Sequence, residues 1–450
     1  MTDTATLGLF GLGTMGSALS LNILENGFAL HVTNREVEMV HDFVQEAKDD
    51  GLAENLHPSD SLEDMVKAMP TPRAILMMIP AGKPVDDTIA TLTPLLAKGD
   101  TIIDAGNSDY RETRRRTKDA EAKGLTYIGM GVSGGENGAR NGPSMMVGGT
   151  PAAWDAVRPV LEAISAKFEG EPCAAHLGPD GAGHFVKTVH NGIEYADMQL
   201  IAEIYGLMRH GRGDSPADVG RRFEAWNKGR LQSYLVEISG KILQATDSET
   251  GEPAVDVILD SAGQKGTGRW TAIEAIRMGE SANVIEAAVA ARAWSSDVKG
   301  RALGAEIYGE VRDEIDVRDE DFEAASREFD WNIDHAKVAE VWRAGCIIRS
   351  ALLDDIASAF REDLPNGELI FAPSFVGTLK EAIPALRRVV CAAGTAGHAI
   401  PALASAQAFF DTMRTKRGTT DLVQAQRDFF GRHGFVRLDG RENQHGPWWD

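Results

Sequence analysis

The sequence predicts a protein of the α/β plus all-α class. A doubly wound, mostly parallel sheet is expected over residues 1–180, a larger and internally duplicated all-helical part over residues 181–438, and a short tail over residues 439–450. Three observations predict this division. A glycine-rich turn stands between a strand pattern and a helix pattern near the N-terminus. Strand patterns give way to helical ones from Gly181 onward. Two helical stretches, beginning at Trp226 and Trp342, resemble each other.

Composition narrows the classes of function. The chain has 450 residues, enough for two domains with substantial cores. A formal net charge of −21 argues against a nucleic-acid or anionic-membrane partner. The three cysteines lie far apart, which is typical of reduced thiols in the cytoplasm: Cys173, Cys346 and Cys391. No signal peptide, long apolar run, C-x-x-C pair or H-E-x-x-H motif occurs. We therefore expect a cytoplasmic protein without a metal site.

The first predicted unit runs from strand to helix to strand. Residues 6–10 form a short apolar strand pattern, residues 17–26 have helical periodicity, and residues 28–33 form a second strand pattern. Between the first two lies a G-x-G-x-x-G turn, made of Gly11, Leu12, Gly13, Thr14, Met15 and Gly16. The motif alone is a weak signal, but this context is that of a Rossmann-type fold, in which the turn brings a pyrophosphate to a helix N-terminus. The alternative is a purely structural glycine turn.

The residues after the second strand bear on the choice of nucleotide. Enzymes that use NAD usually place an acid here, on the ribose 2′-hydroxyl. This chain has Asn34, Arg35 and Glu36 instead. Asn34 removes the repelling carboxylate and Arg35 can pair with a 2′-phosphate, which favours NADP. Glu36 would repel the same phosphate, so NAD or dual use stays open.

Further strand patterns cover residues 74–79 and 101–104, and each is followed by a turn of small residues. Ligands of open α/β sheets bind at the carboxyl ends of the strands. We therefore expect the cofactor to contact the residues Ile79, Pro80, Ala81 and Asn107. The charged helix expected over residues 111–123 is interpreted as a solvated outer face.

A later strand pattern over residues 126–130 leads into a loop with Ser133, Gly134 and Gly135. Successive backbone N–H groups in such a loop can form an anion-binding nest suited to a carboxylate. A flexible surface loop is the alternative interpretation.

One stretch of the helical part carries most of the candidate chemistry. In a helix over residues 181–195 the polar side chains at i, i+3, i+4, i+7 and i+8 share one stripe: Lys187, His190, Asn191, Glu194 and Tyr195. An ordinary solvated face is the alternative. Such a face seldom combines His, Asn and Tyr, however, and Gly181 and Gly183 upstream allow another backbone or a ligand to approach closely.

Several cationic groups remain. Lys265 and Thr267 stand among glycines in residues 260–270 and can hold a phosphate, although the spacing is not that of a P-loop. Arg292 lies in an otherwise apolar helical stretch, where a buried guanidinium needs an anionic partner. Arg427 and His433 lie close together near the end of the chain. The last residues, 440–450, are expected to form an extended tail that needs another surface to lie on.

These residues carry a resemblance that extends over the whole chain. The run K-T-V-H-N-G-I-E-Y at 187–195, the G-Q-K-G-T-G core within 260–270, G-N-S at 106–108 and V-S-G-G-E at 132–136 resemble the signatures of the 6-phosphogluconate dehydrogenases. Glu36 and Pro80 depart from the pattern common in that family, and the tail is shorter than in many relatives.

The resemblance implies a set of roles. Lys187 would be the general base at the 3-hydroxyl of the substrate, and Glu194 the acid that protonates C1 after loss of CO2. Substrate contacts would come from Asn107, Ser133, Gly134, Gly135, His190 and Asn191. The phosphate would be held by Tyr195, Lys265, Thr267 and Arg292. Arg427 and His433 would be supplied by the second subunit of a homodimer.

Two other functions are compatible with parts of the sequence. A β-hydroxyacid dehydrogenase of the same superfamily, which oxidises without decarboxylating, would share the lysine but would need neither the duplicated helices nor Arg427 and His433. A catalytically silent nucleotide-binding scaffold would not be expected to keep both Lys187 and Glu194.

Overall fold

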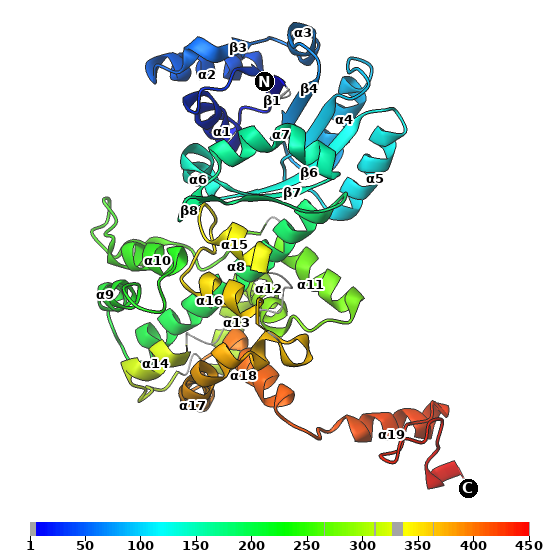
Figure 1. Ribbon diagram of the computed structural model, residues 1–450. Helices are drawn as coiled ribbons and strands as arrows, with labels where there is room; N and C mark the ends of the chain where they lie inside the picture. Colours follow the sequence, from blue (N-terminus) through cyan, green and yellow to red (C-terminus); the bar gives the residue numbers. More distant parts are fainter. Residues whose placement is uncertain (1–5, 265, 310–311, 326–335, 363, 450) are drawn as a thin grey trace.

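The computed structural model describes residues 6–449 except 265, 310–311, 326–335 and 363. In Figure 1 the sheet and its helices form one end of the molecule, the longer helices form the middle, and the C-terminal residues stand apart. Within the described residues no helix is long and apolar enough to span a bilayer.

The sheet has eight strands in the order β10-β7-β6-β5-β4-β1-β2-β3. Neighbouring strands pair in parallel except β6 with β7, which are antiparallel. The strand bounds are β1 (Thr6–Phe10), β2 (Leu30–Thr33), β3 (Leu56–Pro58), β4 (Arg73–Met77), β5 (Thr101–Asp104), β6 (Thr126–Ser133), β7 (Ser144–Gly148) and β10 (Ala174–Gly178), with a separate pair β8 (Lys167–Phe168) and β9 (Glu171–Pro172).

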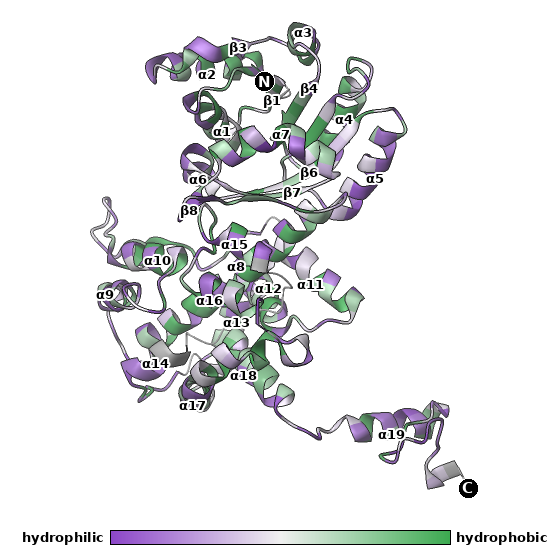
Figure 2. Ribbon diagram, viewed as in Figure 1, coloured by the Kyte–Doolittle hydropathy of each residue, from purple (hydrophilic) through white to green (hydrophobic). Residues whose placement is uncertain are grey.

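Helices cover both faces of this sheet, as a doubly wound fold requires. Their bounds are α1 (Thr14–Glu25), α2 (Val37–Asp49), α3 (Leu62–Ala68), α4 (Lys83–Leu92), α5 (Tyr110–Glu121), α6 (Gly135–Asn141) and α7 (Pro151–Ile164), with a short 3-10 turn at Ala53–Asn55. Apolar residues of α1, α2, α6 and α7 form one core with the sheet, and those of α3, α4 and α5 form another. Figure 2 shows the contrast between the green β4 and the largely purple α5, while α2 is green on one side and purple on the other.

The remaining helices build the second part. They are α8 (Ala182–Gly206), α9 (Pro216–Trp226), α10 (Tyr234–Gln244), α11 (Thr267–Met278), α12 (Asn283–Ser295), α13 (Val298–Tyr308), α14 (Asp319–Ala325), α15 (Ala336–Trp342), α16 (Leu352–Ala359), α17 (Pro373–Thr395), α18 (Pro401–Met413) and α19 (Thr420–Gly431). Shorter turns lie at Leu207–Gly211, Ala254–Val257, Pro365–Gly367, Leu369–Phe371 and Pro447–Trp449. The fold class predicted from the sequence is confirmed. The break between β10 and α8 supports the proposed boundary at residue 181.

The two similar stretches meet in space. Each follows a helix that ends at a tryptophan, α9 at Trp226 and α15 at Trp342. The segments that follow pair with each other through an antiparallel bridge between Ser233 and Ser350. Backbone hydrogen bonds flank this bridge, from the Tyr234 N–H to the Arg349 carbonyl and from the Ala351 N–H to the Gln232 carbonyl. This pairing of equivalent segments supports the predicted duplication.

Helix α8 joins the two parts because its first turns pack directly on the sheet. A Cβ on Gly183 would stand 2.3 Å from the Met146 carbonyl oxygen and 2.4 Å from that of Gly129. Such a clash has no room to relax, so only glycine allows this contact. Gly131 likewise makes room for Lys187, because a Cβ added at Gly131 would lie 2.3 Å from the Lys187 Cβ. The close approach expected of Gly183 is therefore made to the strands β6 and β7.

Three expectations about local structure were wrong. Residues 131–133 extend β6 because they pair with β7, so Ser133 ends a strand. Helix α5 is not merely a solvated face, because Arg116 is buried in ion pairs with Asp86 and Asp104. The C-terminal residues are not extended, since Phe435 and Gln444 pair in an antiparallel bridge that folds the tail back toward α19.

Candidate active site

The glycine turn lies at the topological switch point of the sheet, where β1 separates β4 from β2. Gly11 has a φ of +109° and a Cβ there would stand 2.4 Å from the Met78 carbonyl oxygen. A Cβ on Gly16 would be 1.8 Å from the Gly11 carbonyl oxygen. Gly13, by contrast, faces open space and precedes the uncapped N-terminus of α1. These residues fit a pyrophosphate, which needs free helical N–H groups and room for close approach.

The turns after β4 and β5 lie beside the glycine turn. A Cβ on Gly106 would be 2.8 Å from the Ile79 carbonyl oxygen, so the two turns are in contact. Pro80 and Asn107 are exposed, while Ile79 and Ala81 are partly buried. The structure therefore brings together Leu12, Thr14, Met15, Ile79, Pro80, Ala81 and Asn107 along one edge of the sheet.

A buried carboxylate shapes the turn that holds Asn107. Asp104 accepts hydrogen bonds from the Gly106 N–H at 3.2 Å, from the Ser108 hydroxyl at 2.7 Å and from the Tyr127 hydroxyl at 3.1 Å. It is fully buried. Sequence reasoning missed this residue, although an acid at the carboxyl end of a predicted strand was an available signal.

The residues after β2 are arranged differently from the sequence interpretation. Asn34 is buried and its Oδ1 accepts a hydrogen bond from the Leu12 N–H at 3.0 Å, so it holds the glycine turn. Arg35 is exposed and its Nε lies 2.7 Å from Glu36 Oε1. This pair, together with a hydrogen bond from Asn34, holds the pKa of Glu36 below its usual value. Glu36 thus competes with a 2′-phosphate for the Arg35 guanidinium, through its contacts with Arg35 Nε and Nη2.

Five polar residues on α8 and β6 form one connected and largely buried cluster. His190 Nε2 lies 3.1 Å from Ser133 Oγ, and His190 Nδ1 lies 3.4 Å from Lys187 Nζ and 3.8 Å from Glu194 Oε2. Asn191 Oδ1 is 3.1 Å from the same nitrogen. Lys187 and His190 are buried, whereas the Glu194 side chain is 23% exposed. The expected stripe is therefore real, and its residues Lys187 and His190 face the sheet rather than solvent.

Burial shifts the proton affinities within this cluster. It lowers the pKa of Lys187 to about 8, against opposing effects of Glu194 and Cys346. It raises the pKa of Glu194, which Lys187 and Arg292 oppose, and it lowers that of His190 well below the usual value, helped by Lys187. Removing a charge from water disfavours the ionised form, so an amine loses its proton more readily and a carboxyl keeps it. Both shifts bring a potential base and a potential acid closer to neutral pH.

Aromatic packing fixes the neutral histidine. The Trp342 ring meets His190 edge to face, with ring centroids 5.4 Å apart. Trp342 is buried and its Nε1 lies 3.4 Å from Met146 Sδ. Sequence reasoning used this tryptophan only as the mark of a repeat and missed its place beside the site.

Helices α11 and α12 close the far end of the stripe. Gly268 packs on the ring of Tyr195, where a Cβ would come within 2.5 Å of Cδ2. The Arg292 guanidinium lies over the same ring, 3.7 Å from its centroid. Arg292 is half-buried rather than buried, and among the described residues no carboxylate pairs with it. Thr267 is buried at the start of α11, and Lys265 lies outside the described residues.

Arg427 and His433 are not near this cluster in the same chain. Both are exposed and belong to the C-terminal residues that stand apart from the body (Figure 1). Gly134 and Gly135 both have positive φ and stand at the start of α6, next to Ser133.

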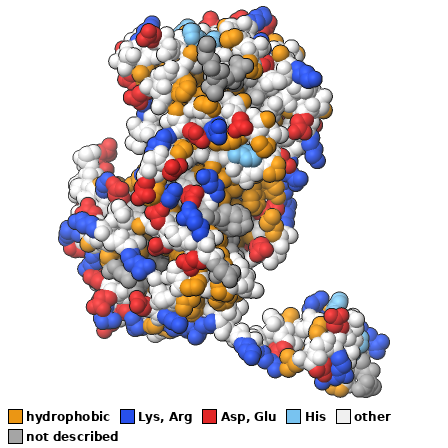
Figure 3. Space-filling view, viewed as in Figure 1, with side chains coloured by type: hydrophobic (Ala, Val, Ile, Leu, Met, Phe, Trp, Pro, Cys, Tyr) orange, Lys and Arg blue, Asp and Glu red, His pale blue; other side chains and the backbone are white. Residues whose placement is uncertain are grey.

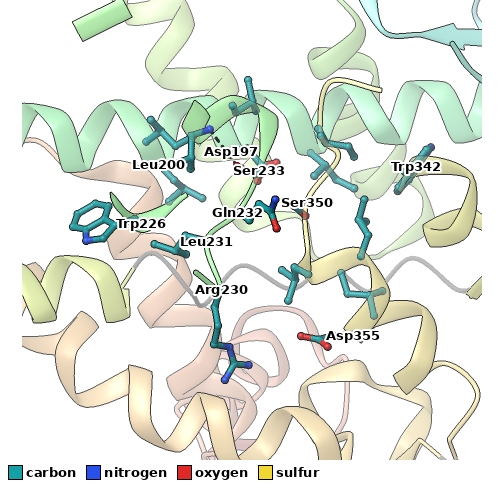
Figure 4. A pocket seen from close by; sticks show the side chains of 18 of the residues that line it. Asp197, Leu200, Trp226, Arg230, Leu231, Gln232, Ser233, Trp342, Ser350 and Asp355 are labelled. Carbon is teal, nitrogen blue, oxygen red and sulfur yellow. Dashed lines mark hydrogen bonds between the residues drawn. The ribbon is translucent and has the colours of Figure 1, made fainter. Parts of the chain in front are cut away.

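A separate apolar cavity of about 180 Å³ lies on the other flank of α8 (Figure 4). Its lining includes Ile193, Asp197 and Trp342 but none of Lys187, His190 and Glu194. Since Trp342 separates it from His190, we do not assign it to the reaction.

The switch-point glycine turn and the buried amine–imidazole–carboxyl cluster define a nicotinamide-nucleotide-dependent dehydrogenase. Comparison with known proteins makes this more specific. The model of the NAD binding domain of 6-phosphogluconate dehydrogenase matches residues 6–178, and that of its C-terminal domain matches residues 183–324 and 319–448. The chain belongs to the 6-phosphogluconate dehydrogenase family.

Relatives match along almost the whole chain. The NADP(+)-dependent, decarboxylating 6-phosphogluconate dehydrogenase of Bacillus subtilis is 41% identical, with 98% of each chain covered. The NAD(+)-dependent enzyme of the same organism is 39% identical, covering 98% of this chain and 99% of the relative. The 6-phosphogluconate dehydrogenase of Plasmodium falciparum, solved in apo form and with NADP+ and 6-phosphogluconate, superposes with a TM-score of 0.93 at 36% identity, covering 99% and 100% of the two chains.

Proposed function

We propose that this chain catalyses the oxidative decarboxylation of 6-phospho-D-gluconate to D-ribulose 5-phosphate and CO2, with NADP as the preferred hydride acceptor. The observation that carries the proposal is the buried Lys187–His190–Glu194 cluster on a helix whose first turns pack on the nucleotide-binding sheet. The family membership supports the same reaction over the full length of the chain.

Lys187 removes the proton from the 3-hydroxyl. A fall in its pKa from 10.5 to about 8 raises the neutral fraction at pH 7 from roughly one in three thousand to roughly one in ten. A nicotinamide nucleotide held at the glycine turn would supply the acceptor for the hydride that leaves C3. The protonated lysine then polarises the new 3-carbonyl, which favours loss of the neighbouring carboxylate as CO2.

Glu194 protonates C1 of the resulting enediol. Its raised pKa supports this role, because a carboxyl whose pKa lies closer to the working pH is a better matched proton donor. His190 stands between acid and base in its neutral form, in which one ring nitrogen donates and the other accepts. Ser133, with the backbone of Gly134 and Gly135, and Asn191 are suited to the carboxylate and hydroxyl groups of a sugar acid.

The phosphate of the substrate is held at the far end of the stripe. Arg292, stacked on Tyr195 and without a described carboxylate partner, supplies a charged fork there, together with Thr267 and Lys265. Arg427 and His433 come from the second subunit of a homodimer. The C-terminal residues that carry Arg427 and His433 lie apart from the rest of their own chain, which supports this arrangement (Figure 1).

An exposed apolar face supports the dimer. Large hydrophobic side chains lie at the surface of α11, α12 and α13 and of the loop before them: Val257, Ile258, Leu259, Ile276, Met278, Trp294, Leu303, Ile307 and Tyr308. Figure 3 shows hydrophobic side chains on the helical part below the sheet. Exposed apolar surface on this scale is typical of a protein interface.

A single assay tests the reaction. Nicotinamide reduction is followed with 6-phosphogluconate while CO2 is trapped, with unphosphorylated gluconate as the control substrate. We expect one CO2 per reduced nucleotide and a much higher KM for gluconate. Reduction without CO2 would instead support the β-hydroxyacid dehydrogenase alternative.

The cofactor preference is tested by Glu36→Gln, with Glu38→Gln, an exposed neighbour on α2, as the matched control. Removing the charge that holds Arg35 should raise the ratio of kcat/KM for NADP over NAD by about tenfold, equivalent to about 1.4 kcal/mol. The control should leave the ratio unchanged. A wild-type preference for NAD of about tenfold would overturn the NADP proposal.

A further inference from the structure

The C-terminal arm, residues 420–449, is held together by its own contacts. Figures 1 and 3 show α19 and the following residues as a compact unit clear of the helical body. The tail after α19 folds back on itself through backbone hydrogen bonds between Phe435 and Gln444, at 2.8 and 3.0 Å. The body of its own subunit therefore does not set the shape of the arm.

One buried carboxylate lies at the centre of this unit. Asp428, on α19, is fully buried although most of the helix is exposed. Its Oδ1 accepts a hydrogen bond from the Gly434 N–H at 3.0 Å and lies 2.6 Å from His445 Nδ1. Its Oδ2 accepts from the Gly446 N–H and from Trp448 Nε1, both at 2.9 Å. A single side chain thus ties the helix to two separate parts of the tail.

Asp428 also binds the residues on either side of His433. The Arg432 N–H donates to the Asp428 backbone carbonyl at 2.9 Å, and the Gly434 N–H donates to the Asp428 side chain. The residues on both sides of His433 are therefore bonded to Asp428. Arg432 adopts a left-handed conformation, φ +50°, which few side chains tolerate without such support.

Arg427 is connected to the same turn through Gln424. The Arg427 Nη1 donates to Gln424 Oε1 at 2.9 Å, and Gln424 Nε2 donates to the Gly434 carbonyl at 2.5 Å. Arg427 and His433, the two residues proposed to act in the partner's site, are thus linked through Asp428 and Gln424. All of these links lie within the arm.

We infer that Asp428 is a positioning residue for the reaction: by binding Gly434, His445, Gly446 and Trp448 it locks the tail onto α19 and sets Arg427 and His433 in the relative places in which the partner's site receives them. The inference rests on the proposed function of the arm. It also gives the short tail a role, since residues 445–448 supply three of the groups around the carboxylate.

The charge of Asp428 suits this role. Burial alone would raise its pKa, but hydrogen bonds from Gly446, His445, Gly434 and Trp448 outweigh it and lower the pKa to about 2. A carboxyl whose pKa is lowered on folding stabilises the fold above its unfolded pKa, near 4, and loses that effect as the pH falls toward 2. The Asp428 carboxylate is therefore ionised at neutral pH, where it can accept all four hydrogen bonds.

The test is Asp428→Asn. The amide keeps one acceptor oxygen but turns an NH2 group toward two of the donors, so the lock loses about half of its bonds. We expect the KM for 6-phosphogluconate to rise about tenfold, with kcat changed less than about threefold and the KM for NADP unchanged. Asp439→Asn is the matched control, since Asp439 is an exposed acid of the same arm that pairs with Arg441, and its kinetic constants should equal the wild type. An unchanged substrate KM in Asp428→Asn would overturn the inference.

Two further measurements separate this inference from the proposal that the arm acts in the partner's site. Mixed dimers of Lys187→Ala and Arg427→Ala chains should regain activity, because one site then has an intact lysine and an intact arm; no recovery would overturn the arm proposal itself. Adding Asp428→Asn to an Arg427→Ala, His433→Ala chain should raise the substrate KM less than about twofold further. A full tenfold effect in that background would show that Asp428 does not act through these residues.

Hydrogen exchange tests whether Asp428 holds the tail on α19, and it does so even if the arm does not act in the partner's site. In Asp428→Asn, amides of residues 432–449 should exchange faster than in the wild type, while those of α8 should not change. Sedimentation should give the same oligomeric state for both proteins. Unchanged exchange in the arm would contradict the inference whatever the kinetics.

Discussion

The two flanks of α8 place ionisable groups in opposite situations. On one flank Lys187, His190 and Glu194 form a connected cluster against the sheet. On the other flank Asp197, one turn beyond Glu194, lines an apolar cavity and has no hydrogen-bond partner among the described residues (Figure 4). Burial, with the negative charge of Glu194, raises the pKa of Asp197 to about 7. The same physical effect thus produces a base and an acid on one flank and an uncompensated charge on the other.

This difference teaches that a shifted pKa marks a reactive site only when the group has neighbours that can use the shift. Lys187 has an imidazole beside it and an acid on the same cluster, whereas no hydrogen-bond partner of the Asp197 side chain is found among the described residues. We therefore expect variants of the first flank to change turnover and variants of the second to change stability.

The largest effect is expected for Lys187→Ala. Loss of the general base should reduce kcat by about 10³-fold or more, while the affinity for NADP, measured by calorimetry, stays near the wild-type value. Lys187→Met, which keeps most of the buried volume, is the control for packing and should be equally inactive. Near-normal kcat in either variant would remove Lys187 from the mechanism.

A smaller effect, on rate and on pH dependence, is expected for Glu194→Gln. Loss of the proton donor should lower kcat by about 10²-fold. Glu194 also raises the pKa of Lys187, so its neutralisation should move that pKa below about 8. Because the base works in its unprotonated form, the acidic limb of the profile of kcat/KM should shift to lower pH. Glu194→Asp keeps the charge and should leave the limb close to its wild-type position; a limb that does not move in Glu194→Gln would argue against coupling of the two groups.

The smallest effect on catalysis is expected for Asp197→Asn, which should instead stabilise the fold. The pKa of this carboxyl is raised on folding, so its cost is absent below pH 4, grows as the pH rises toward about 7 and is constant above that. Since the side chain is partly exposed, we expect a gain of about 1–3 kcal/mol at pH 8 and a smaller one at pH 4.5 in urea unfolding. Asp355→Asn, an exposed acid lining the same cavity, is the control and should not change stability at either pH. Equal gains at both pH values would contradict the assignment.

The same comparison shows which inferences sequence supports. The polar stripe of α8 follows from helical spacing alone, because residues three and four apart share a face in any helix. The glycine turn is likewise local, and its place after β1 follows from the strand pattern. Sequence also showed that Arg427 and His433 lie close together near the end of the chain, although the roles expected for them came from the resemblance.

Tertiary contacts decided the rest. Asp104, Trp342 and Asp428 have no unusual neighbours in sequence, and each acquires its place only because strands, repeats or tail segments distant in the chain converge on it. The pKa of Lys187 is of the same kind, since it depends on how completely packing against β6 excludes water. The sequence by itself determined which groups stand on one face of a helix, because that depends on backbone periodicity. Only the folded structure decided which of those faces was removed from water, because the desolvation of a side chain depends on all the residues packed around that side chain.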